Sequence, residues 1–304
     1  MPSEAHYTRW VGEEALEFMA SQRPEQPWLL WVNFFDPHHP FVVPAEYLDR
    51  LRGRGAPGPK GSIADREGRP SVLMEASRES YAGHARGFQD YSTEELAGAR
   101  LADFAMVEFI DEQVGRILEA ARSLGAEEDL MVLFVSDHGE MLGDHGLMLK
   151  GPMMYEGAMR VPCILRWPGR VPTGLRVGAP SSLVDVAATI SGAAGIPGPP
   201  GDMGLDLSKV ATGEVAPRRA AFAEYRDSGR PYTPPVWTTM VCDEQAKLVV
   251  WHDPAGPGNG HEGELYDLAT DPDELHNRWD DAQFRTVRVR VVRGTCRAPS
   301  AAWP

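Results

Sequence analysis

Two short clusters of polar side chains stand directly after apolar runs of the sequence. The segment Asp36–Pro40 (DPHHP) follows the apolar run Trp28–Phe35, and Asp137–Gly139 (DHG) follows Leu130–Val135. Ligands in open α/β sheets bind outside the carboxyl ends of the strands. If the two runs form neighbouring parallel strands, both clusters open onto one sheet edge, where carboxylates and imidazoles can bind a metal ion or transfer a proton.

Asp137 and His138 together offer a hard oxygen and an imidazole nitrogen, which are part of a site for a divalent cation. Two ligands are too few for any such metal, so a complete site needs others from elsewhere. The same triplet also suits an ordinary turn, in which Asp137 caps the next segment and Gly139 supplies a positive φ. The sequence leaves a metal half-site and a structural turn as alternatives.

Prolines flank His38 and His39 and hold their backbone rigid. We expect the two side chains to diverge, so that at most one faces a site. That histidine can donate a proton to a leaving oxygen or, when charged, bind an anion; the alternative is a proline-rich turn with polar tips. Lys150, thirteen residues after Asp137, has by its pattern alone the character of an ordinary exposed lysine. The sequence contains neither a GxSxG elbow nor a Walker loop.

The elements expected to position these residues alternate between helix and strand. Apolar spacing predicts helices after Thr8, from Ser92 to Gly125 and over Leu183–Ala194, and strands over Trp28–Phe35, Leu130–Val135 and Val161–Leu165. Ser92 and Glu95 have the spacing of a capping box. The run Trp28–Phe35 is apolar at nearly every position, which is typical of a strand covered on both faces. The fold class is therefore α/β, with a mostly parallel sheet and flanking helices.

The character of the sequence changes after about Gly195, where a small α+β subdomain with antiparallel strands is expected. Val236–Val241 and Ala246–Trp251 flank a short polar turn, as in a hairpin, and Leu265–Leu268 could add a third strand. From Arg285 onward the chain has five arginines and no acid. These patterns predict an α/β domain over residues 1–195, an α+β subdomain over 196–284 and an atypical basic tail over 285–304.

Composition argues against several classes of protein. The 304 residues include 44 acidic and 30 basic side chains, a formal net charge of −14, so no basic face for nucleic acid is expected. Cys163, Cys242 and Cys296 occur singly, which suggests neither a zinc knuckle nor a disulfide framework and fits a reducing compartment. The apolar runs are too short to cross a membrane, and Met1–Trp10 lacks an apolar signal core. We expect a cytoplasmic chain; a periplasmic or secreted location stays open if the true N-terminus lies upstream.

Three stretches resemble the sulfatases of the alkaline phosphatase superfamily. They are WLLWVNFFDPHHPF (28–41), LMVLFVSDHGEMLGDHGLMLKGPMMYEGAMR (130–160) with the following Val161-Pro162, and GELYDLATDPDELHN (263–277). The similarity extends from about Tyr7 to Asn277, and its four motifs occur in the family's order. The resemblance implies an alkaline phosphatase-like fold and a sulfuric ester hydrolase with a divalent metal, Ca²⁺ or alternatively Mg²⁺ or Mn²⁺.

The resemblance also implies a role for four positions. Asp137 and His138 match the family's later pair of metal ligands. His38 matches the histidine that contacts the sulfate and protonates the leaving oxygen. Lys150 matches the lysine that holds the sulfate oxygens, so His38 and Lys150 are expected to be catalytic and to bind the substrate.

One family motif is missing from these 304 residues. Sulfatases carry Cys-x-Pro-x-Arg or Ser-x-Pro-x-Arg, whose first residue becomes the nucleophile formylglycine, and earlier paired aspartates that complete the metal site. None of the three cysteines stands in that context. We therefore interpret the chain as the C-terminal fragment of a sulfatase, N-terminally truncated, and expect no turnover by this chain alone.

Two other functions stay open. A phosphonate monoester or phosphodiester hydrolase of the same superfamily would bind a tetrahedral phosphoryl centre in the same site. A non-catalytic remnant would only hold an anion. The expected partner is a small-molecule sulfate ester, with no nucleic acid and no membrane, and either a missing N-terminal half or a second copy of the chain. The sequence does not identify the alcohol of the ester.

Overall fold

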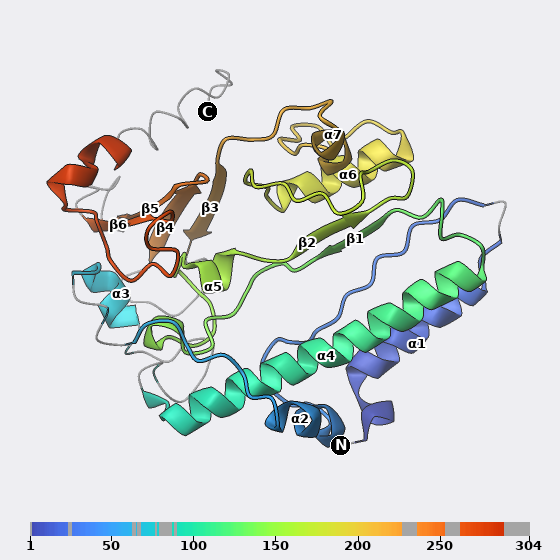
Figure 1. The fold of residues 1–304 in the computed structure, drawn as a ribbon, viewed down its shortest axis with the longest axis horizontal. Helices are drawn as coiled ribbons and strands as arrows, with labels where there is room; N and C mark the ends of the chain where they lie inside the picture. The colour runs from blue at the N-terminus through green and yellow to red at the C-terminus, as the bar shows by residue number, and fades with distance from the viewer. Residues whose placement is uncertain are drawn as a thin grey trace. The chain divides into compact units, whose positions relative to one another are not determined.

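Internal contacts divide the chain of the computed structural model into two units, which are described separately (Figure 1). The described residues are 2–23, 26–62, 65, 68–76, 78, 87, 90–226, 236–252 and 262–288. The first unit comprises Met1–Gly58, Tyr91–Val132 and Arg166–Gly169; the second comprises Pro59–Asp90, Leu133–Leu165 and Arg170–Pro304. The sequence-based boundaries at residues 195 and 284 stay predictions. Cys296 and the tail beyond residue 288 lie outside the described residues.

Helices dominate the first unit: α1 (Tyr7–Ala20), α2 (Ala45–Arg52) and α4 (Thr93–Ser123). A short 3₁₀ turn, η1 (Ser3–Ala5), precedes them. In Figure 1, α1 runs along α4, against which it packs. The predicted capping box begins α4: the Glu95 N–H donates to Ser92 Oγ at 3.2 Å, and the Ser92 N–H donates to Glu95 Oε2 at 2.8 Å. The structure confirms the predicted opening helix and the predicted long helix.

The buried face of α4 follows the helical repeat. Its buried apolar residues are Ala102, Ala105, Met106, Phe109, Ile110 and Ala121. Spacings of three and four residues place the first five on one stripe of the helix. Tyr47 of α2 stacks on Phe109, with ring centroids 4.3 Å apart. Burial of these two aromatic side chains anchors α2 to α4.

The segment Trp28–Phe35 differs from its prediction. It is extended but is not a strand, because no described residue pairs with it in a ladder. Its residues alternate between half-buried and exposed, and Leu29, Trp31 and Phe35 are 65%, 62% and 54% exposed. A run of apolar residues indicates burial of both faces only when neighbouring strands and covering layers are present. In this chain one face of the segment is open.

The strands β1 (Val132–Val135) and β2 (Cys163–Arg166) pair in a two-stranded sheet. Both apolar runs are therefore strands, as predicted. The chain between them contains the 3₁₀ turn η4 (Asp144–Gly146) and the short helix α5 (Glu156–Met159). β1 delivers the Asp137–Gly139 cluster directly at its carboxyl end.

A four-stranded antiparallel sheet lies in the second unit, in the order β3 (Ala221–Arg226), β4 (Trp237–Cys242), β5 (Ala246–His252) and β6 (Glu262–Asp267). The predicted hairpin is β4–β5, and Asp243 closes its turn by accepting from the N–H groups of Gln245 and of Ala246, the first residue of β5. β3 was not predicted because its sequence, AFAEYR, lacks an apolar run. The antiparallel C-terminal strands are confirmed.

The remaining elements of the second unit are α3 (Ser71–Ala76), α6 (Val184–Ala194), α7 (Leu207–Thr212) and the 3₁₀ turn η5 (Ala282–Phe284). The helix α6 agrees with its prediction. Trp279 packs on the sheet so closely that a Cβ at Gly263 would lie 2.2 Å from its ring, so β6 requires glycine there. No helix among the described residues is long and apolar enough to cross a membrane.

Candidate active site

Asp137 and His138 form a compact polar turn after β1. Ser136 Oγ donates to His138 O at 2.9 Å, and the His138 N–H donates to Asp137 Oδ1 at 2.9 Å. His138 Nδ1 lies 2.9 Å from Gly139 O, and since a carbonyl oxygen only accepts, Nδ1 carries the proton. His138 Nε2 faces Asp137 Oδ2 at 3.7 Å. The Asp137 side chain is 83% exposed, so its carboxylate is accessible to an ion.

Gly139 has a different role from the positive φ of a turn, because its φ is not in the left-handed region. A Cβ at this position would lie 2.1 Å from Gly157 O. The Gly139 N–H also donates to Ala158 O at 2.8 Å. Glycine is therefore needed because the backbone of α5 passes against it, and this contact fixes the turn after β1 relative to α5.

The metal half-site remains a half-site in the structure. Among the described residues, no group of three or more His, Cys, Asp or Glu side chains is placed to hold a metal ion. Calcium takes about six to eight oxygen ligands, and Asp137 with His138 supplies only part of such a set. These two residues fit a contribution to a divalent-metal site, and they do not make one by themselves.

Lys150 follows a loop that folds back on itself. The Met141 N–H donates to Leu149 O at 2.9 Å, and the Gly143 N–H donates to Leu147 O at 2.7 Å. Leu147 and Leu149 are buried. Leu149 has a φ of 64°, a conformation that disfavours a branched side chain by about 1 kcal/mol or more. The packed interior of the loop holds this conformation and thereby sets the position of the Lys150 backbone.

The Lys150 side chain is half-buried, and its Nζ atom is buried without a hydrogen-bond partner among the described residues. Burial lowers the pKa of the Lys150 ammonium group, while the carboxylates of Glu140 and Asp137 oppose that shift. Asp137 is thus close enough to Lys150 to act on its charge. This state differs from that of the ordinary exposed lysine that its sequence context suggested.

His38 lies in the turn after the extended segment of the first unit. The His38 N–H donates to Phe35 O at 3.1 Å, and His38 Nδ1 lies 2.6 Å from His39 O. The two imidazole rings stack, with centroids 4.0 Å apart and planes 28° from parallel. The prediction that the two side chains diverge is therefore wrong. Stacking of the imidazole faces and the Nδ1 contact keep both rings on one side of the turn.

Asp36 anchors this turn to the start of α1, a role that sequence patterns did not indicate. Its carboxylate accepts hydrogen bonds from the Tyr7 hydroxyl and, at 2.5 Å, from Thr8 Oγ1. His6 Nδ1 lies 3.8 Å away. Burial raises the pKa of Asp36, and these neighbours oppose the shift. The turn that carries His38 and His39 therefore begins at a buried aspartate that is hydrogen-bonded to the start of α1.

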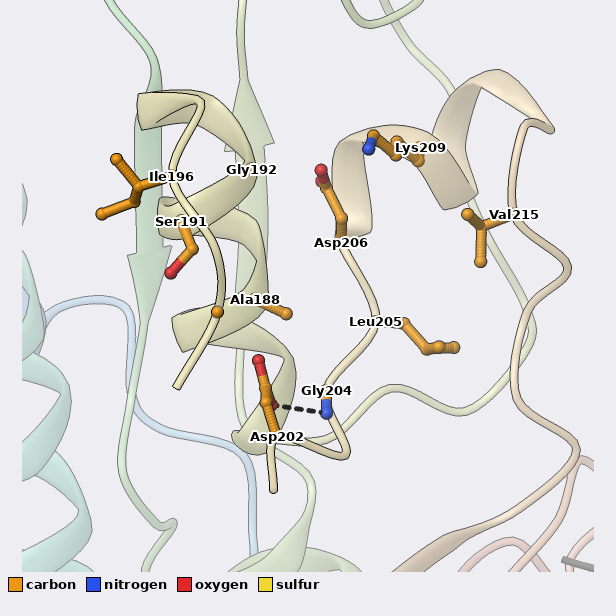
Figure 2. Close-up of a pocket in the computed structure, with 11 residues that line it drawn as sticks. Ala188, Ser191, Gly192, Ile196, Asp202, Gly204, Leu205, Asp206, Lys209 and Val215 are labelled. Carbon is orange, nitrogen blue, oxygen red and sulfur yellow. Dashed lines mark hydrogen bonds between the residues drawn. The ribbon is translucent and has the colours of Figure 1, made fainter. Parts of the chain in front are cut away.

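The structure brings Asp137, His138 and Lys150 into one unit. His38 belongs to the other unit, so the convergence of all four at one sheet edge stays a prediction. A pocket of about 300 Å³ between α6 and α7 contains none of the four (Figure 2). In this pocket the Asp202 carboxylate accepts a hydrogen bond from the Gly204 N–H at 2.7 Å, within its own turn.

Sequence reasoning missed a buried polar network around Arg69. The Arg69 side chain is 0% exposed and contacts Tyr155, His145 and Glu264. Its partners lie 76 to 195 positions away along the chain, so no local pattern could have found them.

Comparison with known proteins assigns the family. The family model "Sulfatase" matches residues 2–196, and the model "N-sulphoglucosamine sulphohydrolase, C-terminal" matches residues 143–295. The chain belongs to the sulfatase family. An arylsulfatase of Clostridium perfringens is 28% identical over 292 residues, which cover 95% of this chain and 56% of the relative. This chain spans about half the length of the curated relatives it matches.

Solved structures agree on the fold. The phosphonate monoester hydrolase of Agrobacterium radiobacter is similar with a TM-score of 0.82 and 27% identity, over 97% of this chain and 61% of that one. A protein solved with its substrate D-glucosamine-2-N,6-O-disulfate is similar with a TM-score of 0.75 and 20% identity, over 94% of this chain and 68% of that one. These similarities confirm the predicted alkaline phosphatase-like α/β fold.

Proposed function

We propose that this chain contributes to sulfuric ester hydrolysis by supplying the sulfate-binding lysine, the proton donor and part of the metal site of a sulfatase. The observation that carries the proposal is the state of Lys150. Its ammonium group is buried, lacks a hydrogen-bond partner among the described residues and lies near Asp137. A cation held in this way is suited to offset negative charge on a transferring sulfuryl group.

His38 is the proposed proton donor to the leaving oxygen. Its imidazole is stacked on His39, and His38 Nδ1 lies 2.6 Å from His39 O, so the ring is held in one orientation. A positioned imidazole can donate a proton to a leaving oxygen. The nucleophile is assigned to a formylglycine motif that these 304 residues do not contain.

Asp137 and His138 are proposed to provide two ligands of a divalent cation, with calcium the first choice and magnesium or manganese as alternatives. The exposed carboxylate and the nearby imidazole support this choice. The described residues do not complete the ligand set, so we route no reaction step through the metal. The remaining ligands are expected from a partner polypeptide or from a second copy of the chain.

A second candidate function is hydrolysis of phosphonate monoesters. The similarity to the phosphonate monoester hydrolase of Agrobacterium radiobacter, with its TM-score of 0.82, favours this candidate. A tetrahedral phosphoryl centre presents anionic oxygens like those of a sulfuryl group, so Lys150 would serve both. Family membership favours the sulfate ester.

The test is anion binding by the purified chain. Calorimetry with sodium sulfate and with phenylphosphonate should show binding that Lys150→Ala weakens by about tenfold, the loss of one charge-assisted contact. Lys209→Ala, which removes an exposed lysine from α7, should leave both affinities unchanged. Equal affinity in the Lys150→Ala variant and the parent chain contradicts the assignment of Lys150. Stronger loss for phenylphosphonate than for sulfate supports the second candidate.

A further inference from the structure

Arg69 is a fully buried guanidinium whose donors are directed at three parts of the second unit. Its Nε donates to Asp65 O at 2.9 Å, and NH2 donates to Glu274 O at 2.9 Å. NH1 donates to the Tyr155 hydroxyl, and NH2 lies 3.3 Å from His145 Nδ1. A planar fork with five N–H groups can make such divergent bonds at once, which a lysine cannot.

Two of these partners bracket Lys150. His145 precedes it by five residues and Tyr155 follows it by five. The segment between them is the packed loop that includes Leu147, Leu149 and the positive φ before the lysine. A loop whose two ends are held by one rigid side chain has little freedom to change the position of a residue at its middle.

The network extends beyond Arg69 and is well satisfied. The Glu264 carboxylate accepts hydrogen bonds from the hydroxyls of Tyr155 at 2.5 Å and Tyr266 at 2.7 Å, and from Trp251 Nε1 at 2.8 Å. Arg69 NH1 lies 3.8 Å from Glu264 Oε1. Because three neutral donors hold Glu264, replacement of Arg69 does not leave that carboxylate without partners.

A second anchor acts on the same end of the loop. The Glu156 N–H donates to Glu274 Oε2 at 2.6 Å, and Lys247 Nζ lies 2.7 Å from both Glu156 Oε1 and Glu274 Oε1.

Burial of His145, with the charge of Arg69 beside it, lowers its pKa to about 3. This ring is therefore neutral above about pH 3 and can accept a hydrogen bond from Arg69 there.

We infer that Arg69 is a positioning residue for Lys150: by holding His145 and Tyr155 at either end of the loop, it fixes the buried position of the lysine that the proposed function assigns to the sulfate. The inference rests on the proposed function for its significance, but the positioning itself is a property of this chain. Arg69 touches neither the predicted substrate site nor the reacting atoms.

The four lysines of the chain allow the burial of the Lys150 amine to be measured without any enzymatic assay. Lys60 and Lys209 are exposed, with Lys60 50% exposed, and serve as references. Lys247 is 1% exposed and reports global unfolding. Brief acetylation of the native chain with N-acetoxysuccinimide, followed by peptide mass spectrometry, gives the relative reaction rate of each lysine. In the parent chain we expect Lys150 to react much more slowly than Lys60.

Arg69→Gln should raise the rate at Lys150 relative to Lys60 by about tenfold, because local opening of the loop exposes its amine. The rate at Lys247 should stay low. The matched control is Arg218→Gln, which removes a guanidinium from the buried pair with Asp185. Tyr155→Phe retains the ring and removes the hydroxyl, which accepts from Arg69 and donates to Glu264, and it should raise the Lys150 rate in the same direction.

An unchanged Lys150 rate in folded Arg69→Gln and Tyr155→Phe overturns the inference. It is overturned equally if Lys150 and Lys247 rise together, or if Arg218→Gln has the same effect as Arg69→Gln, since both results indicate loss of global stability only. If Arg69→Gln does not fold, Tyr155→Phe and the charge-matched Arg69→Gln/Glu264→Gln variant decide. Failure of sulfate to bind the parent chain refutes the proposed function and leaves these rates unaffected.

Discussion

Asp103 illustrates how one side chain can set the response of the first unit to pH. It lies on the buried face of α4, is 8% exposed, and its Oδ1 atom has no hydrogen-bond partner among the described residues. Burial raises the pKa of Asp103 to about 7; Arg100 lowers it and Asp36 raises it further. The folded chain therefore holds a proton on Asp103 that the unfolded chain releases near pH 4.

The contribution of Asp103 to the stability of the first unit should accordingly fall as the pH rises from about 4 to 7. Between these values Asp103 holds more proton in the folded state than in the unfolded state, so its contribution to the free energy of unfolding decreases with pH and levels off above 7. The lowered pKa of His145 in the second unit acts in the opposite direction. Asp103→Asn should remove most of this dependence and raise the free energy of unfolding at pH 8 by on the order of 2–4 kcal/mol. Urea titrations between pH 4 and 8 measure this.

Asp111→Asn, at an exposed position of the same helix, is the control and should leave the pH dependence in place. Equal slopes of the free energy of unfolding against pH in the parent chain and in Asp103→Asn would contradict the prediction and assign the pH dependence to another group.

His38 gives a second prediction at this scale. In a longer sulfatase chain that also carries the formylglycine motif, His38→Ala should reduce kcat/KM for alkyl sulfates by about 100-fold or more, because a poor leaving group needs the proton. The loss for an activated aryl sulfate should be much smaller. His276→Ala, which removes a histidine that is 65% exposed, is the control. Equal losses on both substrates would remove the general-acid role.

At the scale of elements, features that neighbouring residues determine were predicted correctly, whereas the strand predicted at Trp28–Phe35 was not found in the described part of the chain. The capping box at Ser92 and Glu95 and the β4–β5 hairpin were predictable because the interacting groups are neighbours in the sequence. Whether Trp28–Phe35 becomes a strand depends on a partner that sequence composition does not reveal. The stacking of His38 on His39 is also a product of side-chain contact, which the flanking prolines alone do not determine.

The N-terminus of α4 offers a test of the local signals. Ser92→Ala removes the acceptor of the Glu95 N–H and should lower the free energy of unfolding by about 1 kcal/mol. Thr93→Ala, at the adjacent exposed position, should change it by less than about 0.5 kcal/mol. Chemical denaturation followed by circular dichroism measures both. A Ser92→Ala chain as stable as its parent would mean that α4 does not depend on this cap.

At the scale of the whole molecule, the sequence predicted the family and missed the connections that hold the site together. The motifs at 28–41, 130–160 and 263–277 were sufficient for the family. Asn277 in the last motif links β6 to the segment before α3, since its Nδ2 donates to Gly263 O and Gly68 O. The link to Gly68 joins positions 209 residues apart, and no periodicity or spacing encodes it.

The open face of Trp28–Phe35 leads to a prediction for the whole chain. An extended segment with exposed apolar side chains and no ladder partner favours pairing with another chain. Trp31→Lys should reduce concentration-dependent self-association, because a charge on an unpaired edge opposes such pairing. Trp10→Lys replaces a tryptophan of nearly equal exposure, 61% against 62%, on α1 and should have little effect. Sedimentation velocity over a concentration series distinguishes the two, and equal reduction by both would point to general apolar exposure.

The same segment has a consequence inside a cell. Chaperones and proteases of the quality-control system bind extended apolar stretches, and anything that binds such a state competes with the functional one. The aromatic side chains of Trp31 and Phe35 are exposed on a backbone already in the extended form, so no unfolding step is required for their capture. The steady-state amount of this polypeptide would then be set by how quickly a partner covers these eight residues. The abundance of the polypeptide in the cell would therefore indicate how much of it has assembled with a partner.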